Sequence, residues 1–336
     1  MNKLIVTLVA VAMATATLMA QTMPTAPQYL KPGDKVAILS LASTPKRAYV
    51  EAAQATLKQW GYTPVVGQHV LDNCHGYAGT PQQRLDDLMQ ALRDPDVKAI
   101  ISTRGGYGSS MMLTLLHPDT LARYPKWIIG YSDITSMHSA QVRAGNMSIH
   151  ANMCGNLADD DADPKLQGYL RDMLRGKLPT YQVPAHPYNQ CGQASGILLG
   201  GNMAVFSVNF SGSAQWDFLD RDYIAQRDII LFFEDVGETM PRVASMLTQL
   251  RLKGVLHRVK GIMVGRFTDY KPQNGFTDMN DMLHQMLDSY HLDIPICYDF
   301  PASHDEAWNY PLIEGHPVTL DVAPTGVTLR FDSIRR

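Results

Sequence analysis

The first half of the chain alternates short apolar runs with amphipathic segments. Mostly apolar runs of about five residues, bounded by turn-forming residues, are typical of strands buried in a parallel sheet. Apolar residues that repeat every three or four positions are typical of the helices covering such a sheet. The predicted strands are residues 36–41, 63–70, 97–102 and 127–129, each followed by a predicted helix. This alternation predicts an α/β fold with a doubly wound parallel sheet, in which ligands bind beyond the carboxyl ends of the strands.

The second half of the chain repeats the alternation less regularly. The predicted strands are residues 197–199, 228–233, 261–267 and 296–300, followed by a hairpin at 318–320 and 327–331. Helices are expected at residues 203–210, 241–252 and 279–290. The segment 158–194 combines an acidic run, one short helical stretch and a Pro-, Tyr- and Gln-containing run, which favours an interdomain connection. We therefore predict an N-terminal α/β domain over residues 21–157 and a second, mixed α/β domain over residues 195–336.

The first 20 residues have the pattern of a secretory signal peptide. Lys3 supplies the positive charge, residues 4–20 are apolar apart from their threonines, and Ala20 precedes a polar, proline-containing start. An uncleaved anchor is the alternative. No other run is long and apolar enough to cross a membrane. We therefore expect a periplasmic protein with no stable membrane insertion after cleavage.

Composition narrows the class of protein. Hydrophobic residues make up 45% of the 336 residues and charged residues 18%, which allows a substantial core and excludes global disorder. The formal net charge of −3 does not indicate a nucleic-acid partner. No C-x-x-C pair is present, so we expect no zinc site and mostly free, buried thiols, although an exported chain could also bridge them. The cysteines are Cys74, Cys154, Cys191 and Cys297.

The turn that contains Ser132 is the first candidate for chemistry. It joins a predicted buried strand to a predicted helix over residues 134–144. A serine on such a turn can be presented as a nucleophile, and a helix N-terminus stabilises developing negative charge. The spacing from Gly130 matches only part of the G-x-S-x-G elbow, because Ile134 stands where the second glycine would be. The competing interpretation is that Ser132 or Asp133 is simply a helix N-cap.

Two later residues could complete a catalytic group with Ser132. Glu234 follows a predicted buried strand, where a carboxylate is unusual unless it is paired. His304 follows another predicted strand, in a polar loop. The order serine, acid, histidine is compatible with a catalytic triad, although triads occur in several orders. The alternatives are an ion pair between Glu234 and Arg242, a solvated His304, or a metal near residues 304–306, for which no second pair of ligands is present.

A glycine-rich turn at residues 104–108 directly follows a predicted strand. Glycines let the backbone approach a ligand closely, and Arg104 could hold a carboxylate through two hydrogen bonds. A phosphate loop and a purely structural turn are the alternatives. The turn has neither the Walker pattern nor G-x-G-x-x-G, which argues against a nucleotide.

Several of these segments together resemble the LD-carboxypeptidase family of serine peptidases, which includes murein tetrapeptide carboxypeptidases and the microcin-immunity hydrolases. They occur in the family's order from about residue 30 to the C-terminus. The matching segments are Pro32-Gly33-Asp34-Lys35-Val36, Arg104-Gly105-Gly106-Tyr107-Gly108, Gly130-Tyr131-Ser132-Asp133, Gly200-Gly201-Asn202, Glu234-Asp235-Val236-Gly237-Glu238 and His304. Each match is weak by itself, and the six in order are specific.

The resemblance implies a homodimeric hydrolase of two domains that uses no cofactor. It implies Ser132 as the nucleophile, Glu234 as the acid and His304 as the base, with backbone N–H groups near Gly106 and Asp133 as the oxyanion hole. The implied substrate is a murein tetrapeptide, cut before its terminal D-alanine. The implied substrate contacts are Arg104, Tyr107 and Asn202. Family members that recycle murein are typically cytoplasmic, whereas this chain has a predicted export signal.

Two other functions also fit the sequence. A related serine amidase would act on another peptide or on an aminoacyl-nucleotide conjugate. A periplasmic peptide-binding protein without activity would also have two α/β domains and a signal peptide. Turnover and reaction with a serine-directed phosphonate distinguish an enzyme from a binding protein.

Overall fold

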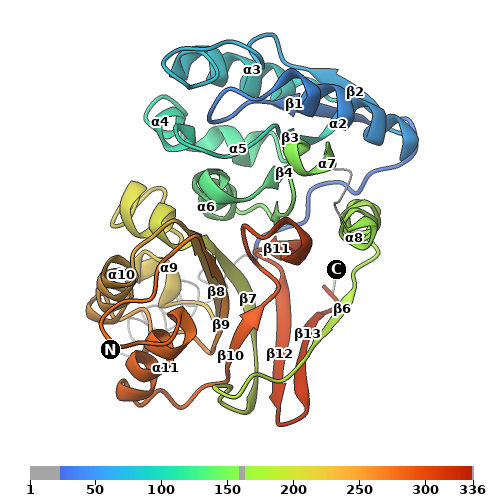
Figure 1. Ribbon diagram of the computed structural model, residues 1–336. Helices are drawn as coiled ribbons and strands as arrows, with labels where there is room; N and C mark the ends of the chain where they lie inside the picture. Colours follow the sequence, from blue (N-terminus) through green and yellow to red (C-terminus); the bar gives the residue numbers. More distant parts are fainter. Residues whose placement is uncertain (1–22, 159–162, 335–336) are drawn as a thin grey trace, which may run out of the picture.

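The computed structural model describes residues 23–158 and 163–334, and the predicted signal peptide lies outside them. Figure 1 shows the described chain as two sheets with their helices, one above the other. One hydrophobic core joins both parts, running from Trp127 through Leu174 to Phe232 and Leu320. In the described part of the chain no helix has the length and apolar character needed to span a membrane.

The first sheet has six strands within the described residues, in the order β11-β5-β4-β3-β1-β2. Neighbours from β5 to β2 are parallel, and β11 is antiparallel to β5. The strands are β1 (Lys35–Leu39), β2 (Thr63–Val66), β3 (Val97–Ser102), β4 (Trp127–Gly130), β5 (Ser148–His150) and β11 (Leu312–Glu314). The predicted parallel sheet is therefore confirmed, with an added antiparallel edge strand.

Helices cover both faces of this sheet, as a doubly wound fold requires. Ile101 and Ile129 face one core, and their neighbours Ile100 and Ile128 face the other. Burial on both faces explains why these strands are continuous apolar runs. One face is covered by α2 (Arg47–Gln59) and α7 (Cys154–Leu157), and the other by α3 (Pro81–Arg93), α4 (Ser109–Leu113), α5 (Asp119–Arg123) and α6 (Thr135–Arg143).

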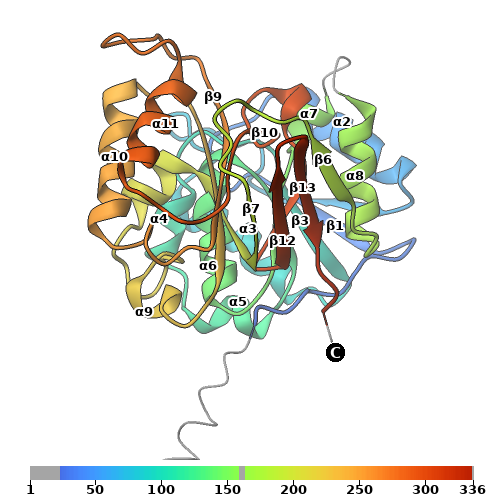
Figure 2. The ribbon, with the colours of Figure 1, turned by 90° about the horizontal axis from the view of Figure 1, so that it is seen from below.

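The second sheet contains both parallel and antiparallel strands, and its described order is β10-β9-β8-β7-β12-β13-β6. Strands β7 to β10 are parallel, and β12, β13 and β6 are antiparallel to their neighbours. The strands are β6 (Thr180–Val183), β7 (Gly192–Asn202), β8 (Ile229–Val236), β9 (Gly261–Thr268), β10 (Ile296–Phe300), β12 (Pro317–Ala323) and β13 (Gly326–Phe331). Figure 2 shows α10 (Met240–Leu252) and α11 (Met279–Ser289) along one face, with α9 (Arg221–Ile224) near them.

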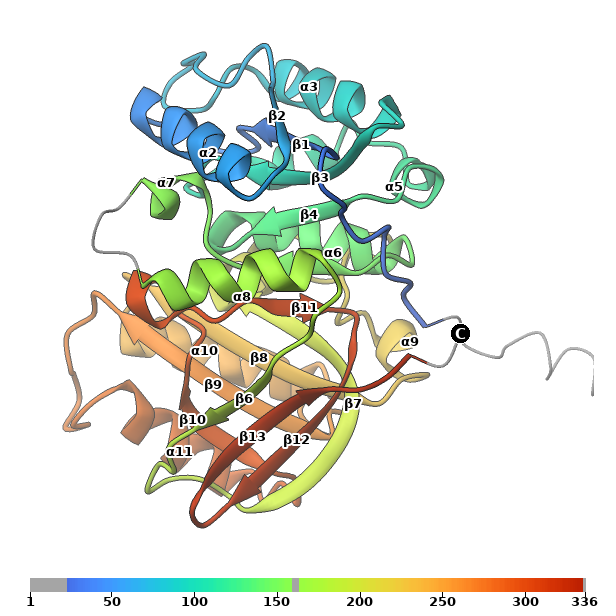
Figure 3. The same cartoon turned by 90° about the vertical axis from the view of Figure 1, so that its right-hand side faces the viewer.

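Several predicted elements differ in extent from those observed. The strand expected at 63–70 ends at Val66, and the helix expected at 203–210 is a π-helical turn, Val205–Asn209. The segment expected to connect the domains contains α8 (Pro164–Leu174), which lies beside the junction of the two layers in Figure 3, and β6, which pairs with β13. The short strands β5 and β11 were not predicted, because three residues are too few to show the hydrophobic pattern of a strand.

Strand β11 matters most for the site, because it carries the chain from one sheet to the other. After β10 the chain leaves the second sheet, pairs Leu312 with His150 and Glu314 with Ser148 in the first sheet, and returns to the second as β12. The loop between β10 and β11 contains His304. It is therefore held between the two sheets, near the carboxyl end of β4.

Candidate active site

Ser132 lies on a strained turn between β4 and α6. It begins a 3₁₀ turn, Ser132–Ile134, and has φ = +62°. That left-handed conformation costs a non-glycine residue about 1–2 kcal/mol and holds the side chain at the end of the strand. Neither this turn nor α6 has a side-chain cap, so the N-cap interpretation of Ser132 and Asp133 is wrong.

Asp133 instead supports a neighbouring helix. Its carboxylate accepts a hydrogen bond from the Ser109 N–H, at 2.8 Å, at the start of α4. Its carbonyl oxygen accepts one from the Ser109 hydroxyl, at 2.5 Å. Burial raises the pKa of Asp133, while these bonds and the positive charge of Arg84 oppose that rise. The Asp133 carboxylate therefore has a structural role at the start of α4. The backbone N–H of Asp133 is the group that was predicted to form part of the oxyanion hole.

The glycine-rich turn packs directly against Ser132. A Cβ on Gly105 would lie 2.9 Å from the Ser132 Cβ and 3.5 Å from the Asp133 nitrogen. A Cβ on Gly106, where φ is +105°, would lie 2.2 Å from the Ser43 hydroxyl oxygen. That hydroxyl accepts a hydrogen bond from the Tyr107 N–H at 3.2 Å. Glycine is therefore required here so that the backbone of the turn can lie against the serine.

Glu234 and His304 form a buried pair. His304 Nδ1 lies 2.6 Å from Glu234 Oε2, and the side chains are 14% and 0% exposed. Burial lowers the pKa of His304, but the charge of Glu234, its hydrogen bond and the charge of Asp235 outweigh burial and raise that pKa. His304 is therefore not a solvated loop histidine. The alternative partner, Arg242, pairs with Glu238 instead, at 2.7 Å.

Ser132 and His304 line the same hollow at the carboxyl ends of the strands. They border a cavity of about 220 Å³, shared with Tyr49, Met153 and Asn156, and a second of about 480 Å³, shared with Val205, Asp235 and Arg242. Nε2 of His304 has no hydrogen-bond partner among the described residues. It is the imidazole nitrogen available to accept a proton from a group in the cavity.

The three predicted substrate contacts differ in how free their side chains are. Arg104 is exposed, lines both cavities and makes no side-chain hydrogen bond or ion pair within the described residues. Tyr107 is 76% exposed and lines the larger cavity. Asn202 lines the larger cavity too, but its amide donates to Asp235 and accepts from the Val205 N–H, so it shapes the wall.

Sequence reasoning missed three residues that contribute to the cavities. Asp235 is buried, and burial together with the charge of Glu234 raises its pKa to about 7. Its position next to Glu234 at the end of β8 was a signal that sequence reasoning did not use. Tyr49 of α2 and Asn156 of α7 line the smaller cavity. Nothing in the sequence connects these helices with the turn of Ser132.

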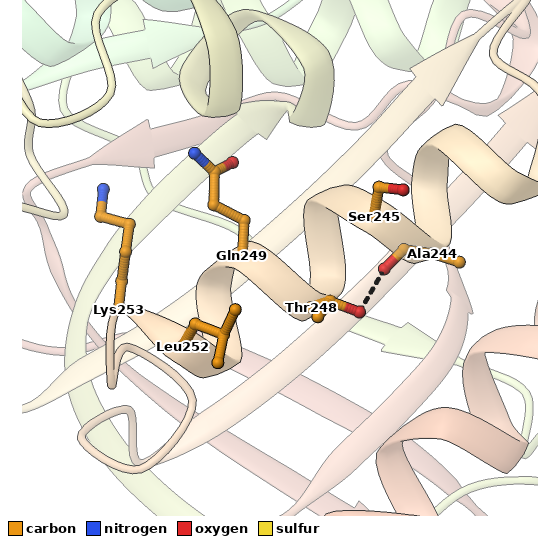
Figure 4. Close-up of a pocket in the computed structure, with 6 residues that line it drawn as sticks. All are labelled: Ala244, Ser245, Thr248, Gln249, Leu252 and Lys253. Carbon is orange, nitrogen blue, oxygen red and sulfur yellow. Dashed lines mark hydrogen bonds between the residues drawn. The ribbon is translucent and has the colours of Figure 1, made fainter.

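Another hollow, of about 510 Å³, lies on the outer face of α10. Figure 4 shows its lining side chains, with the Thr248 hydroxyl bonded to the Ala244 carbonyl oxygen. Its one ionisable lining group, Lys253, forms an ion pair with Asp217 at 2.9 Å. No histidine or carboxylate lines this hollow to act as a base, and its two hydroxyl groups, of Ser245 and Thr248, donate to carbonyl oxygens of α10. The described residues also contain no cluster of three or more His, Cys, Asp or Glu suited to a metal.

A serine and a histidine at one cavity, with a buried carboxylate bonded to the histidine, form the side-chain set of hydrolytic enzymes that work through a covalent intermediate. The LD-carboxypeptidase N-terminal domain matches residues 36–151, and the LD-carboxypeptidase C-terminal domain matches residues 195–320. The chain therefore belongs to the LD-carboxypeptidase family and is a hydrolase of the carboxypeptidase class.

Named relatives agree with this membership. A putative carboxypeptidase of Synechocystis sp. is 33% identical over 83% of this chain and 88% of its own length. The murein tetrapeptide carboxypeptidase of Pseudomonas aeruginosa is 28% identical over 85% of this chain and 94% of its own. Among solved structures, a muramoyltetrapeptide carboxypeptidase from Oxalobacter formigenes is 25% identical, with a TM-score of 0.78 over 90% of this chain and 100% of that one. The microcin C7 self-immunity protein shares the fold, with a TM-score of 0.78 at 20% identity, over 93% of this chain and 100% of its own.

Proposed function

We propose that this protein is a periplasmic serine LD-carboxypeptidase that hydrolyses the amide bond before the C-terminal D-alanine of murein tetrapeptides. The observation that carries the proposal is the buried Glu234–His304 pair, which faces the same cavity as Ser132. The names of the related proteins support the substrate class. The signal-like residues 1–20 support the location.

In this mechanism Ser132 is the nucleophile and His304 the base. His304 Nε2 takes the proton from the Ser132 hydroxyl as the oxygen bonds to the amide carbon. The backbone N–H groups of Gly106 and Asp133 stabilise the oxyanion. When the C–N bond breaks, His304 gives the proton to the departing amine. A water molecule then hydrolyses the acyl-enzyme, passing its proton to His304, which returns it to Ser132.

Glu234 has two effects in this scheme. It holds the proton on His304 Nδ1, so that Nε2 can accept one, and its negative charge stabilises the imidazolium that forms. The pair is buried, so solvent screens this interaction little.

The two cavities lined by Ser132 support the assignment of one part of the substrate to each cavity. We assign the departing D-alanine to the cavity of about 220 Å³, because it suits one small residue. We assign the rest of the peptide to the cavity of about 480 Å³, where Tyr107 provides an exposed ring. Arg104 lines both cavities and is the candidate to hold the terminal carboxylate through two hydrogen bonds.

The test is a Ser132→Ala variant incubated with a murein digest, with mass spectrometry following the loss of one alanine. The wild type is expected to release D-alanine, and the variant is expected to release none. Ser136→Ala is a matched control, because Ser136 is a buried serine of α6 that lines neither cavity. Release of D-alanine by Ser132→Ala contradicts the assignment.

Three further experiments test the remaining parts of the proposal. Turnover of an aminoacyl-nucleotide conjugate in place of the tetrapeptide would indicate a related amidase, whose fold this chain shares. Cell fractionation tests the periplasmic location. Light scattering tests the proposed homodimer.

A further inference from the structure

The loop that carries His304 is tied to both halves of the protein. Arg266 of β9 holds it to the second sheet, donating to Asp299 at 2.6 Å and to Asp305 at 3.2 Å. On the opposite side, the fully buried side chain of Asn309 joins it to the first sheet. Asp299, at the end of β10, precedes His304 in the chain, and Asp305 and Asn309 follow it.

Asn309 makes three hydrogen bonds with its side chain. Its oxygen accepts from the Ser303 N–H at 3.3 Å, which closes the loop around His304. The same oxygen lies 3.2 Å from His150 Nε2, and the amide nitrogen donates to the Asn152 side-chain oxygen at 3.0 Å. His150 ends β5 and is paired with Gly130, two residues before Ser132. Asn309 therefore connects the residue before the base to the strand beside the nucleophile.

Hydrogen-bond chemistry determines how this cluster is arranged. The Ser303 N–H can only donate, so the oxygen of the Asn309 amide must face it. His150 Nε2 meets that same oxygen and must therefore carry the ring proton. Burial, followed by the nearby His138, lowers the pKa of His150, which keeps the ring neutral. One orientation of Asn309 thus satisfies all three neighbours, and a flipped amide would leave the Ser303 N–H facing another donor.

We propose that Asn309 is a positioning residue, which sets the separation between His304 and Ser132 by fixing the His304 loop to the first sheet. The proposal rests on the proposed serine mechanism. The nucleophile follows β4 of the first sheet and the base follows β10 of the second, so contacts between the His304 loop and the first sheet contribute to their distance. Displacement of a reacting group by about 1 Å costs on the order of 100-fold in rate.

The main test is Asn309→Ala, with kcat and KM measured for tetrapeptide hydrolysis well below the melting temperature. We expect kcat to fall about 10- to 100-fold and KM to stay within about threefold, because the substrate cavities lose no side chain. Asn146→Ala is the matched control. Asn146 is buried and donates to Leu121 and Gln141, away from both cavities. It should lower the melting temperature and leave kcat unchanged.

An NMR titration of His304 in isotope-labelled protein tests the same idea without turnover. Glu234 raises the pKa of His304, so a loosened loop should let that pKa fall toward the ordinary histidine value in Asn309→Ala but not in Asn146→Ala. If the wild type releases no D-alanine, the proposed function fails, and this titration still decides whether Asn309 positions the loop. An unchanged titration together with an unchanged kcat overturns the proposal.

If Asn309→Ala does not fold, Asn152→Ala provides the second variant. It removes the bond from the Asn309 amide nitrogen and leaves the contacts of the Asn309 oxygen with Ser303 and His150 in place. The loss of one hydrogen bond of about 1 kcal/mol predicts a fall in kcat of about fivefold. An unchanged kcat in this variant contradicts the proposal.

Discussion

Replacement of Glu234 by Gln is the sharpest perturbation of the proposed mechanism. The change preserves shape and removes one negative charge from a side chain that is 0% exposed and 2.6 Å from His304. The second oxygen, Oε1, has no partner among the described residues, so the new NH₂ group can occupy its place without displacing a donor. The variant therefore tests the charge rather than the packing.

The expected fall in kcat follows from the burial of the Glu234–His304 pair. Removing one partner of a buried ion pair costs about 3–5 kcal/mol, because the remaining charge is left uncompensated. Here that charge is the imidazolium formed in the transition state, so kcat should fall about 10²- to 10⁴-fold. The larger figure applies if the new amide turns its NH₂ toward Nδ1, because Nε2 then keeps the proton and cannot act as a base.

The pH profile of kcat/KM should also shift in a defined direction when Glu234 is replaced. His304 must be neutral to accept a proton, so activity rises as the pH rises through its pKa. In the wild type that pKa is raised, which shifts the acid limb of kcat/KM to higher pH than an ordinary histidine would give. Burial alone lowers the pKa of His304, so Glu234→Gln should move the acid limb to lower pH.

The assay is release of D-alanine from a purified tetrapeptide across the pH range. Asp217→Asn is the matched control, since Asp217 is another buried carboxylate, paired with Lys253 at 2.9 Å and lining neither active-site cavity. This control should lose stability and keep kcat. A fall of less than about tenfold in Glu234→Gln, or an acid limb that stays in place, would refute the role assigned to Glu234.

Three further perturbations test the glycine-rich turn, the buried Arg84 and the burial of the cysteines. Gly105→Ala should lower kcat by about 100-fold in folded protein, because the added Cβ would lie 2.9 Å from the Ser132 Cβ. Full activity of this variant would contradict this packing. Arg84→Met should lower the free energy of unfolding in urea by about 2–4 kcal/mol, because two carbonyl oxygens lose a buried, charged donor; a change below about 1 kcal/mol would argue against that role. A thiol reagent should label exposed Cys191 in the native protein and reach Cys154 only on unfolding, because burial raises the pKa of the Cys154 thiol; native labelling of Cys154 would contradict its burial.

Much of the first sheet could be read from the sequence. Strand β3 was predicted over its full length, and the capping box at the start of α3 involves only Thr80 and Gln83, three positions apart. Such features are local, since burial on both faces produces an apolar run and a cap requires only a few neighbouring residues. The free cysteines agree with expectation, although Cys191 is exposed and Cys74 is half-buried.

Predictions failed where contacts between distant segments decide the structure. Glu234 was expected just after its strand and lies inside β8, which is extended to Val236 by pairing with β9. Strand β11 exists because β5 offers it an edge, and its own three residues do not specify a strand. Asp133 was considered as a cap for its own helix and instead bonds to Ser109 of α4.

The sequence by itself determined the fold class, the family and the residue types available for chemistry, because hydrophobic periodicity and short ordered motifs are local properties. Only the tertiary structure decided which groups meet. It pairs His304 with Glu234 across 70 positions of sequence and brings His304 to the cavity of Ser132. It also ties the His304 loop to the first sheet through Asn309. Proton transfer depends on separations of a few tenths of an ångström, and these are determined by packing between sheets rather than by any local pattern.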